Sequence, residues 1–342
     1  MHSEILISKD SKTPIYKQLM QSIYSLIDSN IYKPGDSLPS LNELAKELDI
    51  SKETVKKAYL HLKEEGTIEP VQGKGFFFAK KDRKTKILIL FDKISTYKQV
   101  LFSSFASNIG NSVEMTIRLH NQDIALFEHF IDENLDDFDY YIIAPHFPLT
   151  PKIQSRLLQS LKRISSNKLI ILDRHVDNLS GNFGCVYQDF ENDVYDGLSQ
   201  GLAEIKKFNK LNILSTKGSL YAQYIKKGIE RFCKEYQIDY KIHTKLSSDI
   251  IAKQEIYLIL NGQLDTELID LVKIAQAKNC EIGKDIGLIS YNESPINEII
   301  LNGLTVLSTD FEMMGALSAK MIVEKDFKKI KCDFNLIKRN TF

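Results

Sequence analysis

Hydrophobic positions near the start of the chain recur with a helical period. Ile15, Leu19, Ile23 and Ile27 fall on one face of a helix, with mostly polar residues between them. This spacing predicts an amphipathic helix. Thr13-Pro14 stands directly before it, so we expect Thr as the N-cap and Pro at the first helical position.

Two shorter helices are predicted to follow the first. Ser40 and Glu43 have the spacing of a capping box, which marks the start of a helix. Ser51 should cap a further helix over residues 52–65, and Gly66 should end it. The inward face of this third helix should carry Val55, Ala58, Tyr59 and Leu62.

A hairpin completes this first segment. Short apolar runs at residues 68–71 and 76–78 flank a glycine-containing tip. Three helices followed by a hairpin are typical of a winged helix-turn-helix, whose third helix enters the major groove of DNA by its N-terminus. A lysine taken alone is as well explained as a solvated surface charge, but the combination favours DNA. The candidate contacts are Ser40, Asn42, Ser51, Lys52, Thr54, Lys56, Lys57, Lys74 and Gly75.

The pattern changes after residue 86 to short apolar strands separated by amphipathic helices. Such alternation predicts parallel sheets covered by helices on both faces, and the number of strands favours two doubly wound lobes. The expected strands are 87–91, 115–119, 140–144, 169–172, 186–187, 211–214, 240–242, 256–260, 286–291 and 305–307. The expected helices are 97–110, 124–133, 151–164, 192–205, 222–237, 265–277 and 311–324.

The fold class expected is therefore α/β, with an N-terminal winged helix and a two-lobed second domain. A charged stretch without apolar residues separates the two and is expected to be a linker. The expected divisions are residues 1–80 for the winged helix, 81–86 for the linker and 87–342 for the second domain, with lobe 1 at about 87–174 and 295–325 and lobe 2 at about 175–294 and 326–342.

Polar and aromatic residues follow several of the expected strands. Ligands of doubly wound sheets bind beyond the carboxyl ends of the strands, and a mixture of carboxylates, amides and aromatic rings suits a hydroxyl-bearing ligand. For Asn261 and Asn292 a turn-forming role is equally open. The candidate ligand contacts are Asp92, Tyr97, His146, Arg174, Tyr221, Gln223, Asn261 and Asn292.

Composition adds mainly exclusions. The 45 basic and 45 acidic residues give a formal net charge of zero, so DNA binding would depend on a local basic surface. The 4 cysteines are widely scattered and lack the spacing of metal ligands, so a zinc site is not expected. No glycine-rich phosphate loop or other cofactor motif is found either, so no cofactor is expected. Neither a secretory signal nor a membrane-spanning run is expected, which favours a cytoplasmic protein.

The first segment resembles the GntR family of transcription regulators. The residues that carry this resemblance span about 12–79 without gaps, notably Pro14–Leu19, Pro34–Ser40, Ser51–Ala58 and Gly73–Phe76. The resemblance implies a homodimer that reads a palindromic double-stranded operator. Asn42, Lys52 and Lys56 stand where the family usually has Arg, which implies a different operator or weaker base discrimination.

Residues 87–342 resemble the effector domain of LacI/GalR-type repressors, a fold of the type I periplasmic-binding-protein class. Tyr140–Pro145 and Asp285–Glu293 are among the segments that carry the resemblance. It implies an effector between two lobes, a monosaccharide by analogy with arabinose-type repressors. Asn261 and Asn292 would contact its hydroxyl groups. Ile225 stands where the family usually has an Arg that anchors the ligand.

The function expected is a ligand-responsive repressor of a carbohydrate-utilisation operon, and not an enzyme. One alternative is a GntR-fused enzyme of the pyridoxal-phosphate aminotransferase type, although the chain is short for that fold and lacks a recognisable Schiff-base lysine context. The other is a sugar-binding protein without a DNA role, which would leave the first 80 residues unexplained. The sequence leaves open which effector binds and whether it induces or co-represses. It also leaves open the operator sequence and the location of the dimer interface.

Overall fold

The computed structural model of the chain describes residues 5–11, 13–29, 31–79, 84–215, 220–260 and 266–342. The chain forms two compact units. The first holds most residues up to Ile87 together with two short segments, Asn111–Met115 and Asn134–Asp139, and the second holds the remainder.

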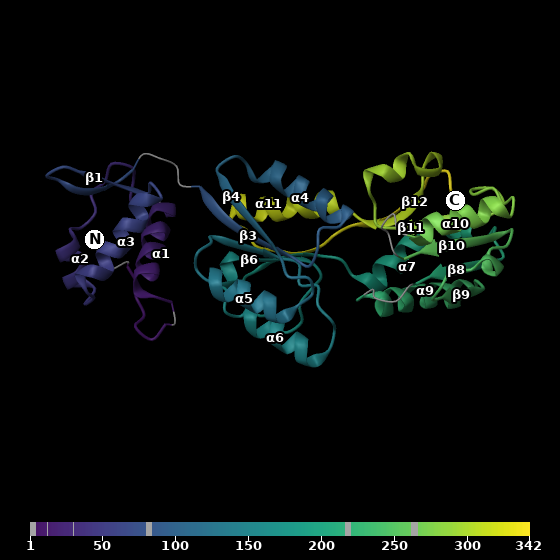
Figure 1. Ribbon diagram of the computed structural model, residues 1–342, viewed down its shortest axis with the longest axis horizontal. Helices are drawn as coiled ribbons and strands as arrows, with labels where there is room; N and C mark the ends of the chain where they lie inside the picture. Colours follow the sequence, from purple (N-terminus) through teal and green to yellow (C-terminus); the bar gives the residue numbers. More distant parts are fainter. Residues whose placement is uncertain (1–4, 12, 30, 80–83, 216–219, 261–265) are drawn as a thin grey trace. The chain divides into compact units, whose positions relative to one another are not determined.

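The first unit has the three helices and the hairpin that the hydrophobic pattern predicted. Its elements are α1 (Ile15–Asp28), α2 (Leu41–Glu47), α3 (Lys52–Glu64), β1 (Ile68–Val71) and β2 (Gly75–Phe78) (Figure 1). The strands pair antiparallel with Ile68 opposite Phe78. One cluster of buried side chains joins the helices to the hairpin, and it includes Leu19, Ile23, Leu44, Val55, Ala58, Tyr59, Leu62, Ile68 and Phe78.

Side-chain caps set the starts of α2 and α3. Ser40 Oγ accepts a hydrogen bond from Glu43 N at 3.3 Å, and Glu43 Oε2 accepts one from Ser40 N at 2.9 Å, so the predicted capping box is present. Ser51 Oγ accepts from Thr54 N at 3.1 Å. These bonds satisfy amide donors that a helix start leaves without partners.

The start of α1 differs from the prediction. Pro14, and not Thr13, is the N-cap, and no side chain caps this helix. Pro14 has an extended ψ of 136°, and its carbonyl oxygen accepts from Lys17 N at 2.9 Å and Gln18 N at 3.1 Å. Because this carbonyl already accepts the first helical hydrogen bonds, Pro14 lies one position earlier than expected.

The second unit contains two six-stranded sheets. The first sheet has the order β13 (Lys329–Lys331), β7 (Gly184–Tyr187), β6 (Leu169–Asp173), β5 (Tyr140–Ile143), β3 (Thr85–Phe91) and β4 (Val113–Leu119). The second has the order β14 (Phe334–Ile337), β12 (Thr305–Thr309), β11 (Gly287–Tyr291), β10 (Glu255–Ile259), β8 (Lys210–Leu214) and β9 (Tyr240–His243). The pairs from β9 through β12 are parallel, and β14 is antiparallel to β12.

Helices cover both faces of the first sheet. α4 and α11 lie together on one face, and α5 and α6 lie on the other (Figure 1). The pattern of apolar strands between amphipathic helices therefore predicted the layers correctly. The bounds are α4 (Thr96–Ile109), α5 (Ile124–Asn134), α6 (Pro151–Leu161) and α11 (Phe311–Glu324).

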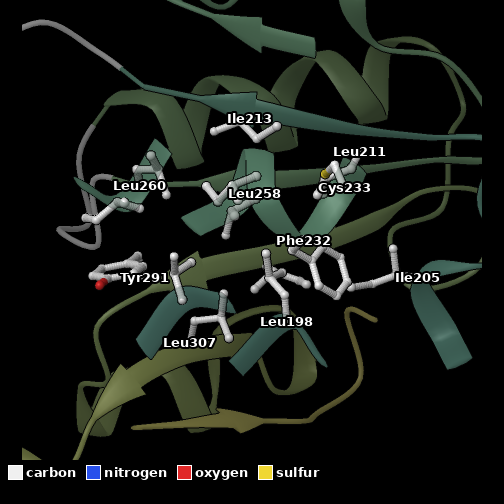
Figure 2. Packing of buried hydrophobic residues seen from close by; sticks show 14 of the residues in the cluster. Leu198, Ile205, Leu211, Ile213, Phe232, Cys233, Leu258, Leu260, Tyr291 and Leu307 are labelled. Carbon is white, nitrogen blue, oxygen red and sulfur yellow. The ribbon is translucent and has the colours of Figure 1, made fainter. Parts of the chain in front are cut away.

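The second sheet has a separate core on each face. Ile256 and Leu258 of β10 face one core, whereas Tyr257 and Ile259 face the other, as the period of a strand requires. Figure 2 shows the first of these cores, where Leu198 and Phe232 pack beside Leu258. Its helices are α7 (Phe190–Gln200), α8 (Leu202–Ile205) and α9 (Ala222–Tyr236), and α10 (Thr266–Ala277) lies on the opposite core.

Several boundaries differ from the expectation. β7 and β13 belong to the first sheet, although their residues were expected in lobe 2. β12 belongs to the second sheet, although its residues were expected in lobe 1. The expected linker is partly strand, because β3 begins at Thr85, whose amide donates to Ser112 O at 2.9 Å. Residues 81–83 of that linker lie outside the described part of the chain. The helix expected over 192–205 begins earlier and is interrupted at Gly201.

Candidate functional site

The N-terminus of α3 presents polar side chains to solvent. Most of the residues predicted to contact DNA are exposed, and Thr54, the exception, is half-buried because its hydroxyl lies 2.7 Å from that of Ser51. The buried face of α3, with Val55, Ala58 and Tyr59, fixes the helix so that the opposite face is free. The exposed candidates are Ser40, Asn42, Ser51, Lys52, Lys56, Lys57, Lys74 and Gly75.

Two of the lysines have partners within the unit. Lys56 Nζ lies 3.6 Å from Glu53 Oε2, an ion pair between exposed side chains on one helix. Lys57 Nζ lies 4.0 Å from the centre of the Tyr16 ring. Exposed ion pairs contribute little to stability, so Lys56 can exchange this carboxylate for a phosphate. Lys57 is held against α1 by a cation–π contact.

The tip of the β1–β2 hairpin leaves its backbone open to close approach by another molecule. Gly73 and Gly75 have φ values of +75° and +100°, a conformation that side chains with a Cβ rarely adopt, and a Cβ added at either glycine would meet nothing within 4 Å. Lys74 N donates to Val71 O at 3.0 Å and closes the turn. Lys74 is therefore presented by a defined turn with open space around it.

A buried polar cluster occupies the strand ends of the first sheet. Asp92 follows β3, His146 follows β5, and Asp173 ends β6, while α4 contributes Tyr97 and Lys98. All of these side chains except that of Tyr97 are among the buried polar residues, and Asp173 is fully buried at 0% exposure. Three of the predicted ligand contacts, Asp92, Tyr97 and His146, are thus brought together.

The carboxylates of this cluster are each already paired. Lys98 Nζ donates to Asp92 Oδ1, and Gln122 Nε2 donates to Asp92 Oδ2 at 3.4 Å. Burial alone would raise the pKa of Asp92, but the neighbouring His146 and Lys98 charges outweigh it and hold the pKa below its ordinary value. Asp92 is therefore ionised, and its oxygens are occupied by groups of the chain itself.

The carboxylate oxygens of Asp173 are also occupied by groups of the chain itself. Tyr97 OH donates to Asp173 Oδ2 at 3.0 Å, and His146 Nε2 lies 2.7 Å from the same oxygen. Gln188 Nε2 donates to Oδ1. Burial opposes ionisation, but the His146 contact and the charge of Lys98 lower the pKa of Asp173 to about 2.

A hydrogen-bond chain runs from Asp173 to the second sheet. Gln188, which follows β7, donates to Asp173, and its Oε1 accepts from Thr309 Oγ1 at 3.0 Å. Thr309 ends β12. Asp173, Gln188 and Thr309 are all buried, so this chain is a water-excluded link between the strand ends of the two sheets.

Arg174 and Tyr221 lie next to this cluster. Arg174 Nε donates to His175 O at 3.1 Å and Nη2 donates to Gln154 Oε1 at 3.0 Å, whereas Nη1 is buried without a hydrogen-bond partner in the described part of the chain. The guanidinium carbon is 5.9 Å from the centre of the Tyr221 ring. Tyr221 also meets the ring of His146 edge-on, with 5.2 Å between centroids.

The ring of Tyr221 is held in place by a neighbouring aromatic ring. It stacks on Phe190 with centroids 4.2 Å apart and an interplanar angle of 10°. Burial raises the pKa of Tyr221 above its ordinary range, and the nearby Arg174 charge opposes that rise. Its hydroxyl is buried and interacts with the Arg174 guanidinium, although no hydrogen bond of good geometry to it is present among the described residues. The Tyr221 hydroxyl and the Arg174 guanidinium therefore lie together beside the cluster.

The remaining predicted ligand contacts are not brought into this cluster within the described part of the chain. Gln223 is exposed at the start of α9. Asn292 has φ +70° and a buried Oδ1 that lacks a partner among the described residues. Its amide donates to Leu307 O at 2.8 Å. Asn261 lies outside the described residues.

Sequence reasoning did not single out Lys98, Gln188 or Thr309. A signal existed for Lys98, because it stands one turn before Leu101 on the face of α4 that also buries Phe105 and Ile109. A lysine on an apolar helical face calls for a buried counter-ion. Gln188 and Thr309 had no such signal, since their meeting depends on how two distant strands end.

The described residues offer neither a cluster of metal-binding side chains nor a helix that is long and apolar enough to cross a membrane. The 4 cysteines are free and buried. Burial raises the pKa of Cys185, Cys233 and Cys332 to about 12, so these thiols stay protonated at neutral pH.

Comparison with known proteins first defines the class of the N-terminal segment. The family model described as "Bacterial regulatory proteins, gntR family" matches residues 15–78. The HTH-type transcriptional repressor YtrA of Bacillus subtilis is 41% identical over 83 residues, which are 24% of this chain and 64% of that protein. The arabinose metabolism transcriptional repressor of Geobacillus stearothermophilus is 34% identical over 79 residues, 23% of this chain and 22% of that protein.

These relatives agree with the winged helix of the first unit, where residues 15–78 match the gntR family model. The chain spans less than two thirds of the length of the curated relatives that it matches. The solved structure of transcription regulator CcpA of Lactococcus lactis is similar with a TM-score of 0.56 at 15% identity, over 76% of this chain and 99% of that one. The two-sheet unit thus has the fold of that structure, in agreement with the two-lobed α/β fold expected from the sequence.

Proposed function

We propose that this protein is a DNA-binding transcription regulator whose affinity for its operator changes when a small molecule binds to the second unit. The observation that carries the proposal is the exposed N-terminus of α3, capped by Ser51 and fixed by its buried opposite face. That arrangement is the one by which helix-turn-helix proteins present side chains to the major groove. The names of the relatives support a repressor.

The finer parts of the proposal concern the partners. We propose a homodimer on a palindromic duplex, because recognition helices related by two-fold symmetry read two half-sites about 34 Å apart. We further propose a carbohydrate-derived effector near Asp92, Tyr97, His146, Arg174 and Tyr221. One relative is named for arabinose metabolism, which supports a sugar-related operon. Gln223, Asn261 and Asn292 stay predicted contacts of the same effector.

A mobility-shift titration of the full chain on promoter duplexes tests the DNA role. The apparent affinity should fall steeply with salt, because binding releases counterions from about as many phosphates as the protein contacts. Lys56→Ala should weaken binding to all duplexes and reduce the salt slope by about 1. Lys63→Ala is the matched control, since Lys63 is exposed on the same helix but near its C-terminal end.

Two outcomes would count against the DNA role. The first is a wild-type chain that shifts none of the duplexes at low salt. The second is an equal loss of affinity for Lys56→Ala and Lys63→Ala, because this would mean a general charge effect and not a docked helix N-terminus. The effector role is tested separately, by the thermal stability of the same protein in the presence of candidate compounds.

A further inference from the structure

We infer that the effector carries an anionic group, a carboxylate or a phosphate, and that Arg174 binds this group together with the hydroxyl of Tyr221. The inference rests on the proposed function, since it names the chemical class of the effector. It goes beyond a neutral monosaccharide, which the family resemblance alone implies.

The guanidinium of Arg174 has no carboxylate within ion-pair distance among the described residues. Its Nε and Nη2 donate to neutral acceptors, His175 O and Gln154 Oε1, and its Nη1 is buried without a partner in the same part of the chain. Arg174 is half-buried, and a guanidinium nitrogen that is shielded from water, as Nη1 is, normally has an acidic counterpart. A bound anion would provide one and would satisfy the free Nη1–H donor.

The carboxylates near Arg174 are already occupied. A neutral sugar is recognised mainly through its hydroxyl groups, which donate to carboxylate or amide oxygens. Asp92 already accepts from Lys98 and Gln122, and Asp173 accepts from Tyr97 and Gln188 with His146 beside it. What remains free around Arg174 is therefore a set of donors, and donors select an acceptor-rich ligand.

The carboxylates of the cluster contact basic side chains other than Arg174. The cluster contains two carboxylates, Asp92 and Asp173, and three basic side chains, Lys98, His146 and Arg174. Lys98 contacts Asp92 and His146 contacts Asp173, whereas no carboxylate of the described residues contacts the guanidinium of Arg174. The ring of Tyr221, stacked on Phe190, lies beside that guanidinium, and the hydroxyl of Tyr221 interacts with Arg174.

The test uses the full chain and a matched set of compounds. Thermal stability and calorimetric titration would compare glucose, gluconate and glucose 6-phosphate, with acetate and inorganic phosphate as the free ions. We expect an anionic compound or free ion to stabilise the protein at concentrations where glucose does not. Binding of gluconate and acetate is compared with binding of glucose 6-phosphate and inorganic phosphate. This comparison shows whether the site prefers a carboxylate or a phosphate.

Variants assign the effect to Arg174. Arg174→Gln should weaken the binding of the anionic compound roughly 10- to 100-fold, the loss expected for a hydrogen-bonded ion pair. Arg174→Lys should retain part of the affinity, because it keeps the charge and loses the forked geometry. Arg163→Gln is the control, since Arg163 pairs with Asp132 at 2.5 Å outside the cluster.

The proposal is overturned if glucose stabilises the protein as well as its charged derivatives do, if none of the anions binds, or if Arg174→Gln binds them unchanged. Operator binding without any added compound is measured on the same samples. A protein that binds its operator but prefers neutral sugars keeps the proposed function and loses only this inference. A protein that fails to bind DNA loses the proposed function whatever its preference among the compounds.

Discussion

At the scale of single residues, position along the chain predicted which polar side chains lie at the strand ends, whereas residue type alone did not. Asp92, His146 and Arg174 were predicted because each follows an apolar strand, and the structure places all three at one end of the first sheet. Lys98 was missed because lysine is normally a surface residue. Its burial depends on Asp92, which is six positions away in the sequence and on a different element.

The buried pair of Lys98 and Asp92 leads to a stability prediction. Lys98 is 1% exposed and Asp92 is 2% exposed. Lys98→Met should lower the free energy of unfolding by about 3–5 kcal/mol, because it leaves a buried carboxylate without its partner. Adding Asp92→Asn should restore part of that loss. Urea denaturation of the wild type, both single variants and the double variant measures the coupling, and additive losses would show that the two side chains do not interact.

The pKa of Asp193 is raised, whereas the pKa of Asp173 is lowered. The side chain of Asp193 is fully buried, Oδ2 accepts from Asp189 N at 2.6 Å, and Oδ1 lies 2.7 Å from the half-exposed Lys331 Nζ. Burial outweighs the attraction of Lys331 and raises the pKa of Asp193 to about 6 from an ordinary value of 3.8. The folded state therefore holds this proton more tightly than the unfolded chain does.

The sign of the pH effect follows from that difference. Stability from Asp193 is fully present below about pH 4 and is lost as the pH rises to about 6. Asp193→Asn should therefore match the wild type at about pH 4 and exceed its free energy of unfolding by about 1–2 kcal/mol at about pH 7. Denaturation curves at the two pH values test this. A variant that is less stable at neutral pH would show that the ion pair with Lys331 dominates.

At the scale of elements, apolar strands were readily predicted and charged ones were not. The expected strands from residue 87 to residue 307 are all present within a few residues of their expected ends. β13 was not expected, because Lys329-Ile330-Lys331 has a single apolar residue. It is the edge strand of its sheet, and edge strands often carry lysines that discourage pairing with another chain.

The close packing of α4 against α11 gives a prediction at this scale. A Cβ at Gly315 would lie 2.3 Å from Leu101 O and 2.8 Å from Phe105 N, so the helix backbones approach too closely for a side chain. Gly315→Ala should lower the free energy of unfolding by about 1–3 kcal/mol through the displacement of α4. Ser103→Ala, at an exposed position of α4, should change it by less than about 0.5 kcal/mol. Equal stability of Gly315→Ala and the wild type would mean that the helices separate without cost.

At the scale of the whole molecule, the alternating pattern predicted two doubly wound sheets but not the strands that pass between them. A strand's own residues report whether it is buried, whereas its sheet depends on which distant strand it pairs with. β12 pairs with β11 and β14, and β13 pairs with β7, although β12 and β13 are consecutive strands in the sequence. The polar links across these strand ends were therefore also beyond prediction from the sequence.

One of those links gives the prediction that belongs to the whole molecule. Gln188 joins Asp173 at the end of β6 to Thr309 at the end of β12. If an effector acts by changing how the two sheets are arranged, this link should favour one arrangement over another. Gln188→Ala removes both hydrogen bonds and should reduce the effect of the effector on operator affinity several-fold. The affinity for the operator without effector, and the affinity for the effector without operator, should change less.

The comparison needs a variant that loses a buried hydrogen bond without affecting that link. Thr341→Val is suitable, because Thr341 Oγ1 donates to Leu288 O at 2.8 Å and accepts from Thr305 N at 2.8 Å within the second sheet. Operator affinity is measured for both variants with and without the compound that stabilises the wild type. If Gln188→Ala and Thr341→Val reduce the coupling equally, the loss reflects general destabilisation, and the chain from Asp173 to Thr309 has no particular part in transmission.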